Sequence, residues 1–178
     1  MSITASITAP VSVFLLTAGL AFPQASPPAQ AAITVGGKKL IINYSAPSVR
    51  GRQIFGDHGL LSQDPTYPAW RAGANSATAF HTDADLNMGG LSVPKGDYTL
   101  YCWVKDANAW ELIINKETGQ WGLSYDARKD VGRIKMTMSK PAAPVERLKY
   151  TLTGQGGNKV KLELAWENHV ASVLMTVK

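Results

Sequence analysis

Side chains suited to binding an anion are concentrated between positions 43 and 80, in segments rich in glycine and proline. Arginine presents a planar fork of N–H donors that matches carboxylate and phosphate oxygens. Neighbouring aromatic rings offer a face on which a sugar or a guanidinium can stack. The pattern predicts a ligand-binding site for an anionic small molecule or an acidic glycan. Its predicted residues are Tyr44, Arg50, Arg52, Trp70, Arg71 and Asn75.

The arginines also have a purely structural interpretation. Arg50 and Arg52 are two residues apart, so on an extended segment both would project from one face, where Arg71 could complete an anion pocket. Alternatively, the three arginines pair with aspartates and brace long loops over an open end of a sheet. Trp70 is equally typical of a core residue with a cation beside it. The sequence leaves open whether the arginines converge.

A second candidate site is the H-x-D-x-D pattern formed by His81, Asp83 and Asp85. At strand spacing all three side chains would point the same way, and imidazole with carboxylates can bind a divalent metal ion. Such a site would need a further ligand, for which Asp57 or His58 is available. Solvated residues at a strand end before a Gly-Gly turn give the same pattern. No cofactor is otherwise predicted.

Evidence for catalysis in the sequence is sparse. His58 or His81 could act as a base oriented by a nearby aspartate, which makes a hydrolase of the cell envelope or the extracellular space an alternative function. However, no G-x-S-x-G motif is present, and that motif belongs to an α/β framework that this sequence lacks. Catalytic residues are therefore left unassigned. His169 is interpreted as a turn residue between two strands.

The single cysteine is interpreted as a buried structural thiol. Cys102 lies within Y-T-L-Y-C-W-V, a strongly β-forming stretch with bulky residues on both faces. A reactive thiolate would require an electropositive, partly exposed setting. Since one cysteine cannot form an intramolecular disulfide, the thiol gives no information about the redox compartment.

The hydrophobic pattern alternates with a period of two along most of the chain after residue 32, and no window shows sustained helical periodicity. Turn sequences separate these short segments, and antiparallel strands with one apolar face must bury it against another sheet. The fold class is therefore all-β, an antiparallel two-sheet β-sandwich, with jelly-roll or immunoglobulin-like topology not resolved. The predicted strands include 33–35, 38–44, 86–88, 91–93, 98–104, 110–115, 160–166 and 171–177.

The N-terminal segment has the features of an export signal. Residues 1–37 contain no Asp, Glu, Lys or Arg, and residues 11–22 form an apolar run too short for an ordinary membrane span. Ala29-Gln30-Ala31 offers a cleavage site. We therefore predict a signal peptide and export segment over 1–31, a single β-sandwich domain over 32–178, and a periplasmic or extracellular location without a membrane span after processing.

Charge composition argues against a dedicated nucleic-acid role. The net charge is +5 at pH 7, but the Lys and Arg residues are scattered singly. Nucleic-acid binders concentrate them on one face or helix. No nucleic-acid partner is predicted, and the oligomeric state is left open.

Several short blocks resemble a bacterial exported-protein family known as domain of unknown function 2911, over about residues 33–177. They are Y-S-A-P-S-V-R-G-R-Q-I-F-G, W-R-A-G-A-N, L-S-V-P-K-G-D-Y-T-L-Y, W-E-L-I-I-N-K, W-G-L-S-Y-D and L-A-W-E. The resemblance implies no established activity. Family members usually have Glu after the Asn of W-R-x-G-A-N, where this chain has Ser76. If that Glu acts as an acid or base in relatives, this protein lacks it.

The leading functional hypothesis is a non-catalytic exported binding module for an anionic small molecule or acidic glycan. The alternatives are the hydrolase described above and a protein-interaction or structural module that uses an edge strand.

Overall fold

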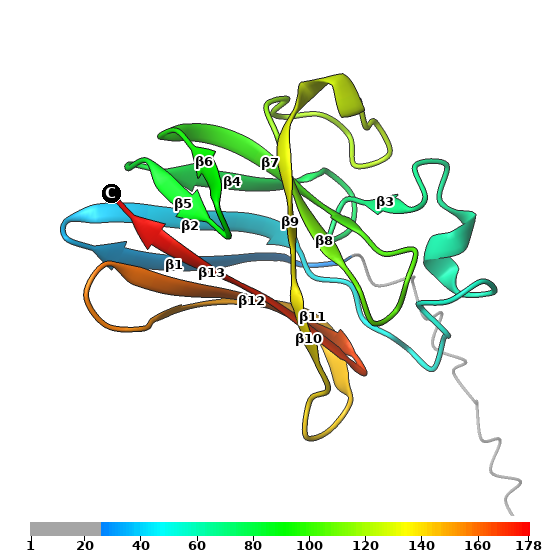
Figure 1. The fold of residues 1–178 in the computed structure, drawn as a ribbon. Coiled ribbons are helices and arrows are strands. Elements are labelled where there is room, and N and C mark those ends of the chain that lie inside the picture. The colour runs from blue at the N-terminus through cyan, green and yellow to red at the C-terminus, as the bar shows by residue number, and fades with distance from the viewer. Residues whose placement is uncertain (1–25) are drawn as a thin grey trace, which may run out of the picture.

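The computed structural model describes residues 26–178 as an antiparallel β-structure without an α-helix (Figure 1). The greater part of the predicted export segment, residues 1–25, lies outside the described residues. The strands are β1 Pro28–Val35, β2 Lys38–Ser45, β3 Ala69–Trp70, β4 Thr78–Thr82, β5 Leu86–Met88, β6 Leu91–Val93, β7 Gly96–Trp103, β8 Glu111–Asn115, β9 Asp130–Lys135, β10 Thr137–Ser139, β11 Val145–Gly154, β12 Lys159–Glu167 and β13 His169–Val177. Two short 3₁₀ turns, η1 Leu60–Gln63 and η2 Ala127–Lys129, complete the elements of this region.

The strands form two sheets, and every pairing is antiparallel. The first sheet has the order β1-β2-β4-β7-β8-β9, with β3 added on β7. The second sheet has the order β11-β12-β13-β5-β6, with β10 added on β13. This arrangement confirms the predicted two-sheet β-sandwich.

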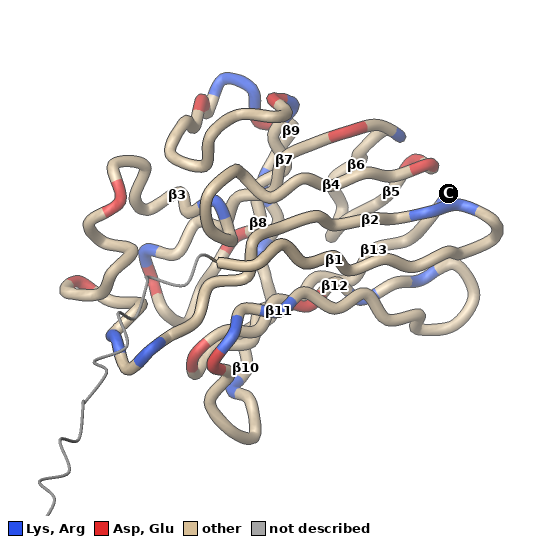
Figure 2. Tube along the Cα trace, turned by 180° about the vertical axis from the view of Figure 1, so that it is seen from behind, with Lys and Arg blue, Asp and Glu red and all other residues tan. Residues whose placement is uncertain are grey.

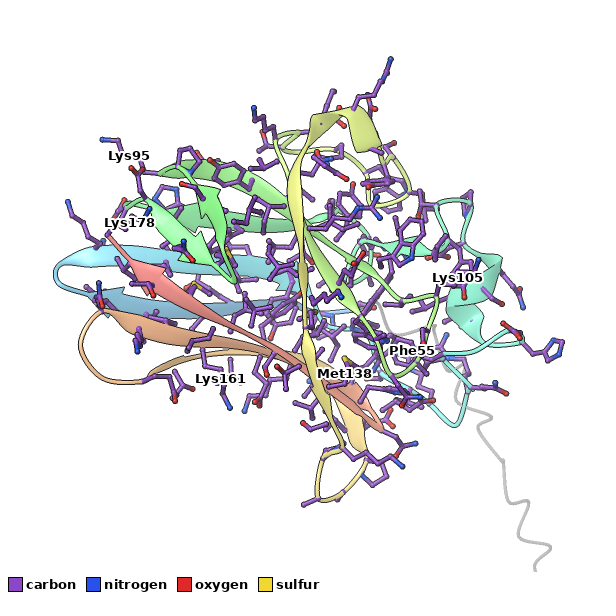
Figure 3. All side chains as sticks on the ribbon, in the orientation of Figure 1. Phe55, Lys95, Lys105, Met138, Lys161 and Lys178 are labelled. Atoms are coloured by element: carbon purple, nitrogen blue, oxygen red, sulfur yellow. The ribbon has the colours of Figure 1, made fainter. Side chains whose placement is uncertain are left out.

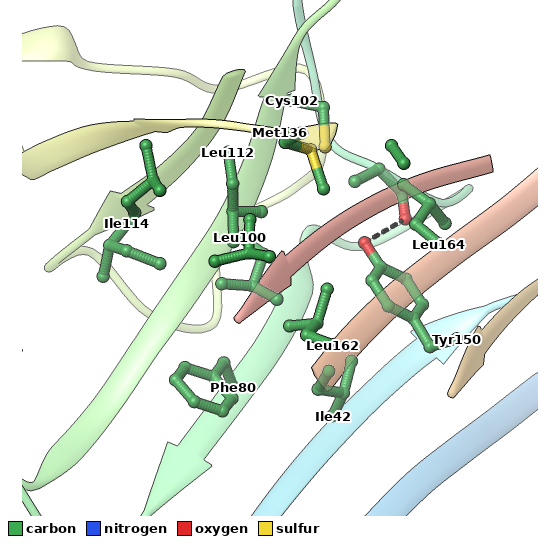
Figure 4. Close-up of a cluster of buried hydrophobic side chains, with 14 of the residues drawn as sticks. Ile42, Phe80, Leu100, Cys102, Leu112, Ile114, Met136, Tyr150, Leu162 and Leu164 are labelled. Atoms are coloured by element: carbon green, nitrogen blue, oxygen red, sulfur yellow. Dashed lines mark hydrogen bonds between the residues drawn. The ribbon is translucent and has the colours of Figure 1, made fainter. Parts of the chain in front are cut away.

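The core lies between the two sheets and consists of the apolar positions that alternate along the strands. Val160, Leu162 and Leu164 of β12 are fully buried, whereas the intervening residues are half-buried. Figure 4 shows Leu162 beside Ile42, which belongs to the first sheet. Removing these apolar surfaces from water is the main favourable contribution to folding.

The central strand β7 is covered on both sides, as its bulky sequence predicts. Leu100 and Cys102 face the main core, while Tyr101 forms a smaller cluster with Ala69 and Ile113 on the opposite face of the sheet. Burial raises the pKa of the Cys102 thiol to about 12, so it stays protonated and inert at neutral pH.

One stretch of chain passes from the first sheet to the second at Met136. Strand β9 pairs with β8, and β10 pairs with β13, so the chain changes sheets within a single residue. The amide of Met136 donates to Trp110 O at 2.9 Å, which anchors the crossing. Gly132 lets β6 approach β9, because a Cβ there would lie 2.7 Å from Leu91 Cδ1.

Strand β1 begins earlier than the sequence pattern indicates. It pairs with β2 from Pro28 opposite Ser45, and Ala31 is buried in the core. The folded unit therefore includes residues before the predicted boundary at residue 32. A domain that started at Ala32 would lose the first half of β1, because Pro28 to Ala31 also pair with β2.

Charged residues of both signs are spread over strand ends and loops (Figure 2). The two ends of the sandwich differ. Lys95 and Lys178 lie at the end where short hairpins meet the C-terminus, whereas Phe55 and Lys105 lie at the end formed by the long loops (Figure 3).

Candidate functional site

The long-loop end of the sandwich is filled by a cluster of aromatic rings. Phe55 lies at its centre, with ring centroids 4.8 Å from Trp110, 5.8 Å from Trp70, 5.9 Å from Trp166 and 4.6 Å from His169. The Trp70 and Trp166 rings stack at 5.6 Å, and those of Trp110 and His169 at 5.4 Å. Such packing fixes the loops that surround the cluster.

The loops around this cluster and the end of β12 enclose a recess of about 220 Å³, which we call the arginine recess. Its wall brings together two of the predicted arginines, Arg52 and Arg71, with the ring of Trp166. Asp64 adds a carboxylate, and Leu60 and Leu61 add apolar surface. With two guanidinium groups and one carboxylate, this wall carries a net positive charge.

Arg71 is held firmly in the recess. Its Nη1 donates to Asp64 Oδ2 at 3.2 Å, and both side chains are largely buried, with exposed fractions of 16% and 22%. Its Nε is buried and has no acceptor among the described residues. Asp64 accepts a hydrogen bond from Nη1 alone, so Nη2 is the donor of Arg71 that is left for an anion in the recess.

The backbone that presents Arg71 adopts an uncommon conformation. Ala72 and Asn75 have φ values of 50° and 61°, a region that costs energy for residues other than glycine. The carbonyl of Ala72 accepts hydrogen bonds from Thr78 Oγ1 at 3.1 Å and from the Tyr150 hydroxyl at 3.0 Å. The buried Tyr150 bond (Figure 4) helps to hold this conformation.

Arg52 braces its own loop through backbone carbonyls instead of an aspartate. Its Nη2 donates to Ser48 O at 2.7 Å and its Nε to Val49 O at 3.0 Å. These bonds set the direction of the guanidinium at the rim of the recess. Arg50 is exposed, does not line the recess, and has its backbone N–H bonded to Glu146 Oε1 at 3.0 Å.

The other three predicted residues, Tyr44, Trp70 and Asn75, form hydrogen bonds within the protein. Tyr44 is buried, and its hydroxyl accepts from Tyr150 N at 3.2 Å. Trp70 is buried, with its Nε1 donating to Gly73 O at 3.2 Å, and reaches the recess only through Trp166. Asn75 is exposed and donates to Ser45 Oγ at 3.4 Å. None of the three lines the recess.

The residues of the H-x-D-x-D pattern do not share one strand face, because β4 ends at Thr82. His81 lies between two carboxylates, with Nε2 3.0 Å from Asp83 Oδ1 and Nδ1 2.7 Å from Asp97 Oδ1. Asp85 instead accepts from Lys95 N at 2.8 Å. Within residues 26–178 no group of three His, Cys, Asp or Glu side chains is arranged to hold a metal ion.

Both ring nitrogens of His81 engage carboxylates, which favours the imidazolium form. The hydrogen bonds to Asp83 and then to Asp97 raise the pKa of His81, and the bond to His81 lowers the pKa of Asp83. The arrangement is therefore that of a surface ion pair bridging β4 and β7.

His58 and His81 lie at opposite ends of the sandwich, so they do not form one catalytic cleft. His81 pairs with Asp97 at the beginning of β7, and Asp83 lines a hollow with Lys95 and Lys178. His58 belongs to the loop that carries Phe55 at the other end (Figure 3). The hydrolase alternative therefore lacks a cleft that contains both histidines.

Sequence reasoning did not select Asp64, Trp166 or His169 as site residues. Asp64 follows η1, and its role depends on a contact with Arg71 that sequence spacing does not reveal. Trp166 and His169 face each other across the turn between β12 and β13. The signal available in the sequence was the W-E-N-H stretch itself, a bulky aromatic and a histidine at the two sides of a tight turn.

The aromatic cluster and the arginine recess also unite the sequence blocks on which the family resemblance depends. Phe55, Trp70, Trp110 and Trp166 come from four of those blocks. The whole-chain comparison agrees, because residues 26–175 match the model of the family described as Protein of unknown function (DUF2911). The chain belongs to this family.

The DUF2911 match begins at residue 26, close to the start of β1. No curated protein matches the chain. No solved structure matches it either. Ser76, which stands where the family pattern was expected to have Glu, forms an isolated bridge with Trp121 and does not line the arginine recess.

Within residues 26–178, the structure contains no helix long and apolar enough to cross a membrane.

Proposed function

We propose that this DUF2911 member is an exported binding module that takes an anionic small molecule, or the carboxylate of an acidic glycan, in the arginine recess. The observation that carries the proposal is that Arg52 and Arg71, distant in sequence, line one recess with Trp166. Each guanidinium is already oriented by protein contacts, so little side-chain entropy would be lost on binding.

The recess suits a carboxylate of modest size. A carboxylate between Arg52 and Arg71 would accept charge-assisted hydrogen bonds from both, while Leu60, Leu61 and Trp166 would contact the apolar part of the ligand. Asp64 would compete for Arg71 and so discriminate against ligands that present too little negative charge.

The test is a titration of the purified protein with sodium galacturonate and, separately, inorganic phosphate, followed by tryptophan fluorescence. Because Trp166 lines the recess, binding should change its emission in a saturable way. Arg52→Gln should weaken binding by about tenfold or more, since a hydrogen bond to a charged group contributes about 1.5–3 kcal/mol. The control Arg128→Gln removes a guanidinium that pairs with Asp126 and does not line the recess.

Two results would contradict the proposal. One is the absence of saturable binding with both anions. The other is equal affinity in the wild-type protein and Arg52→Gln.

A further inference from the structure

The aromatic cluster borders a second recess, of about 480 Å³, that shares no lining residue with the arginine recess. We call it the histidine recess. It lies between the β7–β8 loop, β10 and the turn from β12 to β13. Its wall includes Asn108, Met138, Ser139, Lys140, Asn168 and His169.

We propose that the histidine recess is a second ligand site, specific for an uncharged hydroxyl-rich ligand such as a monosaccharide unit. The proposal depends on the kind of hydrogen-bonding groups that the wall presents and on how His169 is held.

His169 is fixed by packing, with its Nδ1 buried and its Nε2 left to meet a ligand. Its ring stacks on Trp110 with an interplanar angle of 17° and contacts Phe55. Its Nδ1 lies 3.5 Å from Glu167 Oε2 and makes no well-aligned hydrogen bond to any described residue. The side chain is 20% exposed, so the rigid ring can reach a ligand in the recess through Nε2.

Burial lowers the pKa of His169, and the nearby charge of Lys140 acts in the same direction, against Glu167. The imidazole is therefore uncharged at neutral pH, and Nε2, the ring nitrogen that is not buried, offers one hydrogen-bonding group to a ligand. A sugar hydroxyl can pair with either a donor or an acceptor, and the nitrogen of an uncharged imidazole can be either one according to its tautomer, whereas a permanently cationic group can only donate.

The neighbouring turn holds the histidine in place. Glu167 has a φ of 53°, uncommon for a residue with a side chain, and its Oε1 accepts from Ile54 N at 3.3 Å. This contact ties the turn to the loop that carries Phe55. The stacked partner, Trp110, is fully buried, yet its indole N–H has no acceptor among the described residues. Trp110 does not line the recess, so this donor is not part of its wall.

The rest of the wall fits the same ligand class. The amides of Asn108 and Asn168 each offer donors and an acceptor, and Ser139 adds a hydroxyl. Met138 gives a half-buried apolar surface for the C–H face of a sugar ring. Lys140 is the one ionised side chain in the wall, so charge does not dominate the recess as it does between Arg52 and Arg71.

The experiment titrates the purified protein with glucose, galactose, mannose and N-acetylglucosamine. Binding is followed by tryptophan fluorescence and by the imidazole resonances in ¹H–¹⁵N spectra, because His58, His81 and His169 are the only histidines to assign. We expect at least one sugar to shift the His169 resonances in a saturable way while those of His58 and His81 stay unchanged.

Two variants separate a binding role from a structural one. His169→Phe keeps a ring that can stack on Trp110 but removes both nitrogens, and should weaken sugar binding by about tenfold or more. Asn108→Ala alters an exposed side chain outside the stack and should weaken binding while leaving the unfolding midpoint unchanged. Arg52→Gln, which tests the arginine recess, should leave sugar binding intact.

The proposal is overturned if no sugar gives a saturable shift at His169, or if His169→Phe and Asn108→Ala bind the sugar as tightly as the wild-type protein. It is also overturned if inorganic phosphate binds here instead, with a response lost in Lys140→Met and kept in His169→Phe. Loss of sugar binding with galacturonate binding retained in His169→Phe would distinguish this site from the arginine recess.

Discussion

Arg71 packs directly on the backbone of Gly122. A Cβ atom on Gly122 would lie 1.9 Å from Arg71 Cδ and 2.5 Å from Asn75 O. The amide of Gly122 also donates to Asn75 O at 3.1 Å. The loop between β8 and β9 therefore covers one side of Arg71, which accounts for the burial of its Nε.

Gly122→Ala should destabilise the protein by about 1–3 kcal/mol, because the added methyl group overlaps both a side chain and a backbone carbonyl. This corresponds to a fall of roughly 2–4 °C in the unfolding midpoint for each kcal/mol. The matched control is Gly154→Ala, where the nearest atom lies 3.9 Å from the added Cβ. Equal midpoints for the two variants would show that the contact with Arg71 is not rigid.

Asp64→Ala should have opposite effects on stability and on anion affinity. Losing the partner of a largely buried guanidinium should cost about 1–3 kcal/mol of unfolding free energy. The freed donor of Arg71 should then bind galacturonate more tightly than in the wild-type protein. Chemical denaturation and fluorescence titration measure the two quantities. A fall in both would indicate that Asp64 supports the recess and does not compete with the ligand.

The ion pairs of His81 predict a defined pH dependence. The folded-state pKa of His81 is raised above its unfolded value of about 6.5. The ion pairs of His81 therefore contribute their full stabilisation below about pH 6.5. It is lost as pH rises through the folded-state pKa. On the acid side it is lost as pH falls through the lowered pKa of Asp83. Unfolding midpoints of wild type and His81→Gln should therefore differ near pH 5.5 and converge near pH 9.

The three groups are well exposed, so the difference at pH 5.5 should be small and should shrink with added salt. A difference that instead grows towards pH 9 would contradict the assignment of a charged His81.

The pairing of β1 from Pro28 predicts that the folded unit needs the residues before Ala32. A protein that begins at Ser26 keeps all of β1, whereas one that begins at Ala32 loses Pro28 to Ala31, including the pairing of Ala31 with Ile42. The shorter protein should unfold at a clearly lower temperature or fail to fold, since it also uncovers the edge of β2. Equal midpoints for the two proteins would show that the first half of β1 adds no stability.

Much of the fold could be predicted from the sequence because the alternation of apolar residues directly reports which face of a strand is buried. This holds for β12, β13 and the two-sided strand β7. It fails for the first part of β1, because Ala29 and Ala31 are small residues in a proline-rich stretch that gives no β signal, whereas the predicted strand at 33–35 is confirmed. It also fails at Asp85, where β4 ends before the expected strand position.

The site could be predicted only in part for a similar reason. Side-chain type indicated that arginines could bind an anion, and the fold does bring Arg52 and Arg71 together. Tyr44 and Trp70 could not be distinguished from surface residues by type alone, because their burial depends on contacts with Tyr150 and Trp166 in strands far along the chain. Asp64 was missed because its contact with Arg71 arises from the path of an irregular loop.

The most direct test of the central claim is the unfolding midpoint of the wild-type protein and of Arg52→Gln as a function of galacturonate concentration. A ligand that binds only the folded state stabilises it by about 2.7 kcal/mol at a concentration of 100 times its Kd. We predict a midpoint that rises with galacturonate in the wild-type protein and stays nearly constant in Arg52→Gln. The same rise in both proteins, or no rise in either, would contradict binding in the arginine recess.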